Sequence, residues 1–277
     1  MTGSVTVNHL LDAGHQVIGL DVAPYPASLP PRWSRPDFSY TFCDLTDYGD
    51  TVEALAGADA VVHLANIPAP TIYPAARTLN RNTLMNNNVF LAAVDRGIPR
   101  VVWASSETTL GLDFSAENVP DYVPLDEDHY PKPTTTYSLS KVLAETMAEQ
   151  LAAWSSTTFV ALRLSNVITP EAYAGFPAAW ADPALRQFNL WSYIDVRDAA
   201  EACRLALTAD VPPCSSYIIA AADSAMPVPS EELLEANYPG LRRTRPVSGF
   251  ESLMTAEKAR RVLGFVPAHS WREHVQG

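Results

Sequence analysis

Hydrophobic positions in the first 165 residues form short runs of β-forming residues that alternate with longer segments of helical spacing. The runs predict strands over residues 16–21, 38–43, 60–64, 100–105 and 158–164. Between them, the spacing predicts helices over residues 47–56, 78–96 and 137–154. Strands and helices that alternate in this way are typical of a parallel sheet. We therefore predict an α/β fold for residues 1–165.

The pattern loosens after residue 165, where prolines divide the chain into short pieces, among them those at 170, 177, 183, 212, 213, 227, 229, 239 and 246. We interpret residues 166–277 as a small mixed region that covers the substrate and returns elements to the core of the first region.

Composition narrows the classes of partner. Lys plus Arg number 19 and Asp plus Glu number 31, which gives a formal net charge of −12. Such an acidic surface repels phosphate groups, so we expect no nucleic-acid or anionic-membrane partner. No apolar run approaches the roughly 20 residues of a bilayer span. The three cysteines (Cys43, Cys203 and Cys214) are far apart and fit neither a metal site nor a disulfide framework, which favours a reducing compartment and the cytoplasm as location.

Tyr137 and Lys141 are four residues apart at the start of a predicted helix, so both side chains lie on one face. A phenol has a pKa of about 10, and a neighbouring ammonium lowers that pKa by favouring the phenolate. The pair therefore suits proton transfer. The alternative is an ordinary surface pair on a helix.

Ser105 and Ser106 follow a buried run and fall at the carboxyl end of a predicted strand, where α/β sheets place ligand chemistry. A hydroxyl here can hold a substrate alcohol. The alternative is that both serines only cap the strand end and its turn.

In these motifs the chain resembles the extended short-chain dehydrogenases/reductases, also called the NAD-dependent epimerase/dehydratase family. The resemblance rests on several segments in matching order: CDLTD (43–47), VVHLAN (61–66), NNNVFLAAVDRGIPRVVWASS (86–106), TYSLSK (136–141), LRLSNV (162–167), YIDVRDAAEA (193–202) and EKARRVLGFVP (257–267). It implies a Rossmann-type doubly wound parallel sheet, with residues 1–165 as the dinucleotide-binding domain.

The resemblance also implies roles for individual residues. Tyr137 becomes the general acid/base, Lys141 the residue that lowers its pKa and binds the nicotinamide ribose, and Ser106 the hydroxyl that polarises the substrate oxygen. Ser106 is preferred to Ser105 because it stands five residues before Gly111. The remaining positions implied for the cofactor are Gly3, Asp44, Leu45, Ala65, Asn66, Asn82 and Ser105, and Asn166 lies near nicotinamide and substrate. A homodimer through helices 78–96 and 137–154 is implied as well.

Asp21 ends the second strand of the family pattern, where a carboxylate accepts hydrogen bonds from ribose hydroxyls and repels a 2′-phosphate. We therefore expect NAD in preference to NADP. The alternative is an aspartate that only initiates a turn.

The glycine-rich turn of the family is incomplete in this chain. Gly3 falls on the third glycine of the G-x-x-G-x-x-G pattern, and the first strand and first two glycines have no counterpart. The expectation is an N-terminally truncated start that lacks about a dozen residues, with weak cofactor binding and reduced stability as consequences.

Two further features concern the substrate. Glu107 stands beside Ser106, and we expect a mostly solvated loop residue, with substrate contact as the alternative. Only 28 residues separate Asn166 from Asp195, which indicates a compact pocket. Its expected lining includes the segment Trp191 to Tyr193, with plain packing as the alternative. In compactness the chain is similar to the uronate dehydrogenase branch, whose members oxidise free sugar acids.

The leading hypothesis is an NAD-dependent oxidoreductase that acts on a secondary alcohol or ketone of a small sugar or sugar acid. One alternative is a sugar epimerase that retains its NAD, using the same residues. The other is a non-catalytic nucleotide-binding or regulatory module, since the glycine turn is incomplete.

Overall fold

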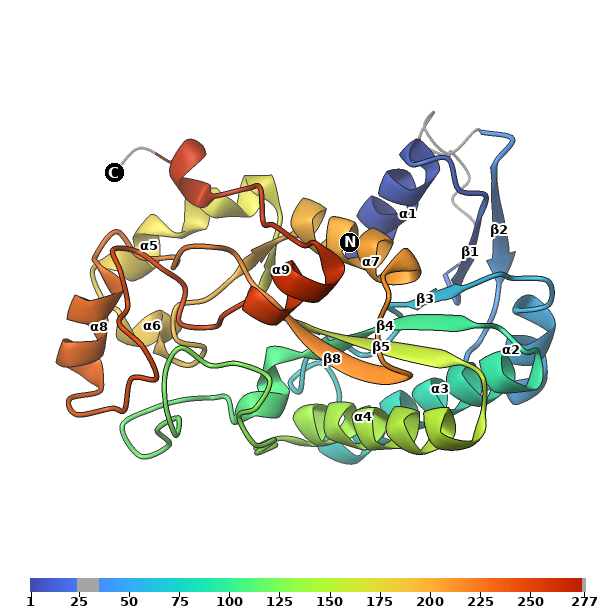
Figure 1. The fold of residues 1–277 in the computed structure, drawn as a ribbon, viewed down its shortest axis with the longest axis horizontal. Coiled ribbons are helices and arrows are strands. Elements are labelled where there is room, and N and C mark those ends of the chain that lie inside the picture. The colour runs from blue at the N-terminus through green and yellow to red at the C-terminus, as the bar shows by residue number, and fades with distance from the viewer. Residues whose placement is uncertain (24–34, 276–277) are drawn as a thin grey trace.

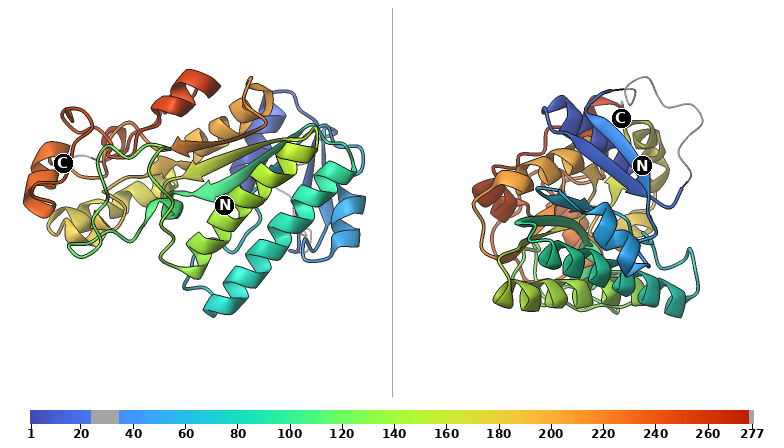
Figure 2. Two further views of the ribbon diagram at one scale, coloured as in Figure 1. Left: turned by 60° about the horizontal axis from the view of Figure 1, so that its bottom comes forward. Right: turned by 90° about the vertical axis from the view of Figure 1, so that its right-hand side faces the viewer.

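The computed structural model describes residues 1–23 and 35–275, and it has a parallel sheet between two layers of helices (Figure 1). Helices α3 (Ala75–Asp95) and α4 (Thr136–Trp154) lie side by side on one face of the sheet (Figure 2). Helices α1 (Thr2–Asp12) and α7 (Val196–Thr208) pack together on the other face. The predicted α/β architecture with parallel strands is confirmed.

The main sheet has the strand order β3-β4-β5-β8. Its strands are β3 (Val61–His63), β4 (Arg100–Ser106), β5 (Thr158–Leu164) and β8 (Cys214–Ile219). All three pairings are parallel, so the strands end at a common carboxyl edge. In the register of β4 and β5, Ser105 pairs with Arg163.

A second parallel pair consists of β1 (Val17–Asp21) and β2 (Phe38–Phe42). Within residues 1–23 and 35–275 no ladder joins this pair to β3. The pair stands beside the main sheet at the end where β3 is the edge strand (Figure 1). The expectation of a further strand that precedes residue 1 stays a prediction.

The core forms where the central strands carry continuous apolar runs, as expected for strands covered on both faces. Trp103 and Phe159, on β4 and β5, are fully buried, and Phe90 of α3 packs against both with ring centroids 5.4 and 5.2 Å apart. Such edge-to-face aromatic contacts stabilise the fold in addition to the stabilisation that comes from burying apolar area. This cluster ties α3 to the middle of the sheet.

Local sequence signals fix where α4 begins. Thr135 precedes the helix, and its side chain accepts the backbone N–H of Ser138 at 3.1 Å. The Ser138 hydroxyl in turn accepts the N–H of Thr135 at 2.9 Å. This reciprocal capping satisfies two of the free N–H groups of the first turn. It places Tyr137 and Lys141 in the first two turns, next to the end of β4.

The region after residue 165 returns α7 and β8 to the core, and its other elements are short. They are β6 (Val167–Ile168), α5 (Pro177–Trp180), α6 (Ala184–Gln187), β7 (Ile194–Asp195), α8 (Ser230–Asn237) and α9 (Glu257–Leu263). Among the described residues, no helix is both long and apolar enough to cross a membrane.

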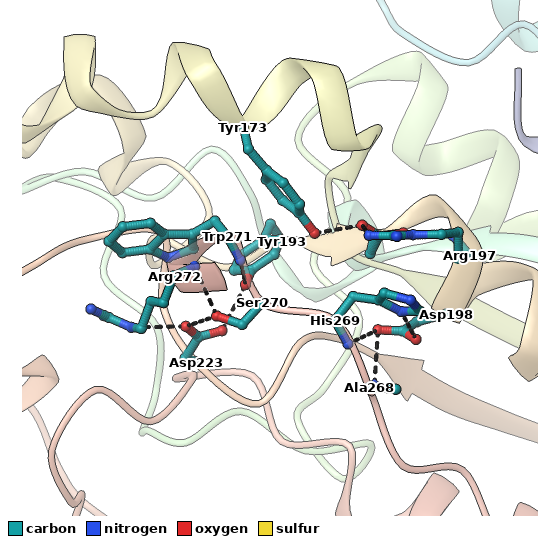
Figure 3. Close-up of polar contacts among 11 residues, drawn as sticks. Tyr173, Tyr193, Arg197, Asp198, Asp223, Ala268, His269, Ser270, Trp271 and Arg272 are labelled. Atoms are coloured by element: carbon teal, nitrogen blue, oxygen red, sulfur yellow. Dashed lines mark hydrogen bonds and ion pairs between the residues drawn. The ribbon is translucent and has the colours of Figure 1, made fainter. Parts of the chain in front are cut away.

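The C-terminal segment is held onto this region by two aspartates (Figure 3). Asp198 of α7 accepts the backbone N–H groups of Ala268 and His269 at 3.1 and 3.0 Å. Asp223 accepts hydrogen bonds from the Ser270 hydroxyl and from Nε of Arg272 at 2.8 and 2.9 Å. These bonds fix residues 268–272 against the end of the molecule that carries α5 (Figure 1).

Candidate active site

The structure brings Ser106, Tyr137 and Lys141 together at the carboxyl edge of the sheet. Ser106 ends β4, and its hydroxyl lies close enough to the phenol of Tyr137 to lower the pKa of that phenol. The Nζ of Lys141 lies 5.6 Å from the centroid of the Tyr137 ring. Tyr137 is 8% exposed and Lys141 is 2% exposed. The pair is therefore a buried one, and the alternative of an ordinary surface pair is wrong.

Lys141 is held in place by two acceptors. Its Nζ donates to the carbonyl of Ala104 at 2.6 Å and to Oδ1 of Asn66 at 3.0 Å. Burial lowers the pKa of Lys141 to about 7, against the opposing effect of the Glu145 charge. At neutral pH the side chain of Lys141 therefore exchanges readily between its protonated and neutral forms.

The pKa of Tyr137 is raised above its usual value in this structure, and the expected lowering by Lys141 stays a prediction. Burial raises the pKa of the phenol, the hydrogen bond from Ser106 opposes that rise, and the nearby charge of Glu107 adds to it. Tyr137 thus holds its proton at neutral pH in this structure. Such a group is suited to donate a proton, and it needs a positive charge close by to accept one.

The two neighbouring serines point to different partners. Ser106 accepts the backbone N–H and the hydroxyl of Thr108 at 3.2 and 3.0 Å, so it caps the turn as well as contacting Tyr137. Ser105 donates to Oε1 of Glu145 at 2.5 Å. Its predicted contact with the cofactor stays a prediction, since its hydroxyl is engaged with α4.

The loop after β3 carries a polar network that reaches Lys141. Asn66 donates through Nδ2 to Oδ1 of Asn86 at 3.1 Å, and His63 lies 2.9 Å from the same oxygen. Burial lowers the pKa of His63 to about 4, so its imidazole is neutral. Ala65 is exposed beside Asn66, and its predicted contact with the cofactor stays a prediction. The network fixes the amide of Asn66 relative to the ammonium.

The buried side chain of Asn82 forms hydrogen bonds with other residues of the protein. Its side chain accepts the backbone N–H of Ile67 at 2.8 Å and donates to the carbonyl of Ile67 at 3.1 Å. It also contacts the hydroxyl of Ser140 at 3.4 Å. Asn82 therefore ties the loop after β3 to α3 and α4, and its predicted cofactor contact stays a prediction.

The acidic residues expected at the adenosine end lie at the end of β1 and after β2. Asp21 is exposed, and its Oδ1 accepts the backbone N–H of Ala23 at 3.0 Å, which is the turn that the alternative interpretation expected. Asp44 accepts the N–H and the hydroxyl of Thr46 at 3.0 and 2.8 Å, and these bonds lower its pKa. Leu45 is buried in the core.

Gly3 lies in the first turn of α1. A Cβ added there would meet no atom within 4 Å, so nothing in the described residues requires glycine at this position. Its predicted contact with a dinucleotide rests on the family pattern alone.

Glu107 is 5% exposed, so the expectation of a solvated loop residue is wrong. Its carboxylate accepts hydrogen bonds from the hydroxyl of Ser165 and from Nδ2 of Asn189 at 3.2 Å. Burial raises the pKa of Glu107 to about 7, and the hydrogen bonds and the charge of Arg186 oppose that rise. No pattern in the sequence pointed to Asn189, because Asn189 and Glu107 are 82 residues apart along the chain.

Arg186 of α6 is a second site residue that the sequence analysis missed. One terminal nitrogen donates to Oδ1 of Asn166 at 3.3 Å and to the carbonyl of Ser192 at 3.2 Å. Its Nε is buried without a hydrogen-bond partner among the described residues. The guanidinium also lies 5.0 Å from the Phe176 ring. A signal existed, since Arg186 is the one basic residue between Asn166 and Val196.

The segment Trp191 to Tyr193 does not line a pocket as expected. The side chains of Trp191 and Tyr193 are fully buried in two apolar clusters. The alternative of plain packing is the one the structure supports.

The donor set of this edge fits a dinucleotide. The exposed carboxylate of Asp21 ends β1, and the half-exposed carboxylate of Asp44 follows β2. The amide of Asn66 follows β3 and the hydroxyl of Ser106 ends β4. The phenol of Tyr137 and the ammonium of Lys141 lie in the first two turns of α4. Carboxylates accept hydrogen bonds from ribose hydroxyls, and the carboxyl edge of a parallel sheet is where such ligands bind. The phenol and the serine hydroxyl can move and orient a proton on a substrate oxygen.

Known proteins resemble this chain over parts of its length. A family model described as the NAD dependent epimerase/dehydratase family matches residues 1–220. The chain is 31% identical over 146 residues to the NAD-dependent glucose-6-phosphate dehydrogenase of Haloferax volcanii, a match that covers 50% of this chain and 55% of that protein. It is 33% identical over 106 residues to the uronate dehydrogenase of Agrobacterium fabrum, covering 38% of this chain and 37% of that protein.

The fold also matches solved structures. The UDP-glucose 4-epimerase from Thermotoga maritima, solved with UDP-glucose, superposes with a TM-score of 0.71 over 99% of this chain and 92% of that chain, at 20% identity. At that identity the likeness shows the fold alone. The matches to the two dehydrogenases span 55% and 37% of their lengths, so activity and substrate do not transfer from them directly.

Proposed function

This chain belongs to the NAD dependent epimerase/dehydratase family, and from that premise we propose that it is an NAD-dependent oxidoreductase acting on a secondary alcohol or ketone of a small sugar or sugar acid. The observation that carries the proposal is the contact between Ser106 and Tyr137 beside the buried ammonium of Lys141. This arrangement supplies a proton donor, a group that orients the reacting oxygen, and a charge that stabilises the phenolate.

The three residues divide the chemistry as follows. NAD, when bound, supplies the acceptor for the hydride. Tyr137 takes the proton of the substrate hydroxyl during oxidation and returns a proton to the carbonyl oxygen during reduction. Ser106 holds the same oxygen through its hydroxyl. Lys141 stabilises the phenolate form of Tyr137 through its positive charge, which lowers the cost of deprotonating a buried phenol.

The residues proposed to hold NAD follow the carboxyl edge of the sheet. Asp21 would accept the hydroxyls of the adenosine ribose, with Asp44 and Leu45 near the adenine and Ala65 and Asn66 along the middle. Lys141 would bind the nicotinamide ribose. The further positions in the proposal are Gly3, Asn82 and Ser105. The exposed carboxylate of Asp21 supports NAD over NADP, because it would repel a 2′-phosphate.

The proposed substrate is a sugar that carries an anionic group. Arg186, beside Glu107 and Asn166, has an unpaired buried Nε, and a guanidinium binds carboxylates and phosphates with two parallel hydrogen bonds. The names of both dehydrogenase relatives refer to anionic sugars, a sugar phosphate and a uronate. Both observations support an anionic substrate in preference to a neutral one.

The test is a substrate panel with NAD and NADP, using uronic acids, sugar phosphates and neutral sugars, and following formation of the reduced nicotinamide. With the best substrate, Tyr137→Phe should lower kcat by about 100-fold or more. Tyr130→Phe is the matched control, since Tyr130 is 74% exposed. Full activity of Tyr137→Phe would overturn the proposal. Turnover of a sugar without net reduction of NAD would instead favour the epimerase alternative, and NAD binding without turnover would favour the binding module.

The proposal includes a homodimer and a cytoplasmic location. Leu84 of α3 and Leu143 of α4 are 43% and 40% exposed on the paired helices, which supports a subunit contact there. The three cysteines are unpaired, which supports a reducing compartment. Light scattering with Leu143→Glu, which should yield a monomer, tests the dimer.

A further inference from the structure

Helix α4 is joined to β4 by side chains one helical turn apart. Lys141 donates to the carbonyl of Ala104, and Glu145 accepts the hydroxyl of Ser105 at 2.5 Å. Tyr137, Lys141 and Glu145 follow one another at intervals of four residues and so lie along one face of the helix. The face that carries the phenol and ammonium therefore continues into a carboxylate that is fixed to the same strand.

Glu145 is also held from the neighbouring strand. Arg163 of β5 donates through Nε to Oε1 at 3.0 Å and through a terminal nitrogen to Oε2 at 2.8 Å. The side chains of Arg163 and Glu145 are 5% and 16% exposed. Because Arg163 pairs with Ser105 in the sheet register, one carboxylate bonds to adjacent residues of two strands. Bidentate bonding of this kind fixes both the position and the orientation of the carboxylate.

The surroundings of this carboxylate contain few other charges. Arg163 contacts the carbonyl of Glu127 at 3.5 Å, and the carboxylate of Glu127 accepts the backbone N–H of Ile218 at 2.6 Å. Around Lys141 stand the phenol of Tyr137, the amide of Asn66 and the neutral His63. Of these groups, Glu145 is the one whose charge favours the protonated form of Lys141, and it acts against the effect of burial.

We propose that Glu145, held by Ser105 and Arg163, is a positioning residue that fixes α4 on the strand end and balances the ammonium of Lys141 with its negative charge. The effect of Glu145 on catalysis rests on the proposed function. A purely structural ion pair could be replaced by apolar side chains of similar volume at little cost in stability. An ion pair one turn from a buried lysine has an additional effect that apolar side chains cannot supply.

The direct test measures the pKa of Lys141 and does not depend on an enzymatic activity. The chain has three lysines, Lys132, Lys141 and Lys258, so ¹³C-lysine labelling gives a simple NMR spectrum, which Lys141→Arg assigns. A pH titration should show that Glu145→Gln lowers the pKa of Lys141 by about half a unit to one unit. Glu149→Gln is the matched control, one turn further along α4 and exposed, and it should leave that pKa unchanged. An unchanged Lys141 titration in Glu145→Gln overturns the proposal.

A second variant keeps the test valid if Glu145→Gln does not fold. Glu145→Gln leaves Arg163 buried without its partner, which can destabilise the protein strongly. The double variant Glu145→Gln/Arg163→Gln removes both charges, and it should lower the pKa of Lys141 by less than Glu145→Gln does, because the opposing charge of Arg163 is lost as well. If this variant is folded by thermal unfolding and circular dichroism and still titrates like the unaltered protein, the proposal fails.

Activity then separates this proposal from the proposed function. For substrate oxidation, less protonated Lys141 stabilises the phenolate less, so the rising limb of kcat/KM should move to higher pH in Glu145→Gln. A merely structural role would lower activity equally at all pH values. If the NMR titration shifts and the unaltered protein has no NAD-dependent activity on any substrate, the proposed function fails and the role of Glu145 stands.

Discussion

The Nζ of Lys141 lies 3.0 Å from Oδ1 of Asn66, which joins the second turn of α4 to the loop after β3. The ammonium is buried, so each of its acceptors contributes to keeping it charged and in place. The contact also connects the residue proposed for the nicotinamide ribose to the loop proposed for the middle of the cofactor.

Removing this acceptor should weaken the site. We expect Asn66→Ala to lower kcat/KM by about 10- to 100-fold, since hydrogen bonds to charged groups contribute roughly 1.5–3 kcal/mol. Steady-state kinetics with NAD measures the loss. Asn87→Ala is the control, because Asn87 follows Asn86 on α3 and its side chain donates to Oδ1 of Asn88 at 3.4 Å, away from Lys141. Equal effects of the two variants would contradict a specific role for Asn66.

Asp21 should decide which nicotinamide cofactor is used. Its exposed carboxylate would repel a 2′-phosphate, so Asp21→Asn should reduce the preference for NAD over NADP by about tenfold or more. The ratio of kcat/KM values for the two cofactors measures the preference. The control is Asp59→Asn, another exposed aspartate. A preference that survives in Asp21→Asn would leave the turn at Ala23 as the role of this residue.

Arg186 should affect anionic substrates selectively. Arg186→Gln is expected to raise KM for a uronate or sugar phosphate by about 10- to 100-fold, because a charge-assisted pair is lost. KM for a neutral sugar of the same configuration should change little. Arg261→Gln, on the exposed side of α9, is the control. A uniform loss with charged and neutral sugars would contradict anion recognition and point to a structural role.

Glu107 should make stability depend on pH. Burial raises its pKa from 4.5 to about 7, so the folded state binds its proton more tightly than the unfolded state. The stabilisation is complete below pH 4.5 and is lost as pH rises towards 7, and the full change is about 3 kcal/mol.

Comparison with a variant isolates this effect from the titration of Lys141, whose lowered pKa acts in the opposite direction above pH 7. Between pH 5 and pH 8, Glu107→Gln should gain stability relative to the unaltered protein. Urea unfolding at both pH values measures the gain, and Glu117→Gln, at an exposed position, should show none. A constant difference between Glu107→Gln and the unaltered protein would show that Glu107 keeps an ordinary pKa.

Trp271 should stabilise the C-terminal segment. It is 3% exposed, donates through its indole nitrogen to the carbonyl of Ser224 at 2.8 Å, and packs against Trp180 with ring centroids 5.0 Å apart. Trp271→Ala should lower the free energy of unfolding by about 3–5 kcal/mol. Val266→Ala, with a 63% exposed side chain, should change it by less than about 0.5 kcal/mol. Chemical denaturation tests both.

The sequence by itself determined most of the strands and helices of the first 165 residues and the positions of the proposed catalytic pair. Strands such as residues 158–164 can be predicted because an apolar run is a local feature of the sequence. The observed strand β5 covers the same residues. The start of α4 follows from the Thr135 and Ser138 capping pair, one residue from the predicted start. The spacing of Tyr137 and Lys141 needs only the helical period to place both on one face.

Only the tertiary structure decided which polar side chains meet. Ser105 and Ser106 are adjacent in sequence, yet the first bonds to Glu145 and the second bonds to Thr108 and lowers the pKa of Tyr137. Glu107 is buried because Asn189, 82 residues away, approaches its carboxylate, and the raised pKa follows from that burial. Burial and hydrogen bonding of a polar group depend on partners that distant segments supply, and a local pattern of residues does not contain them.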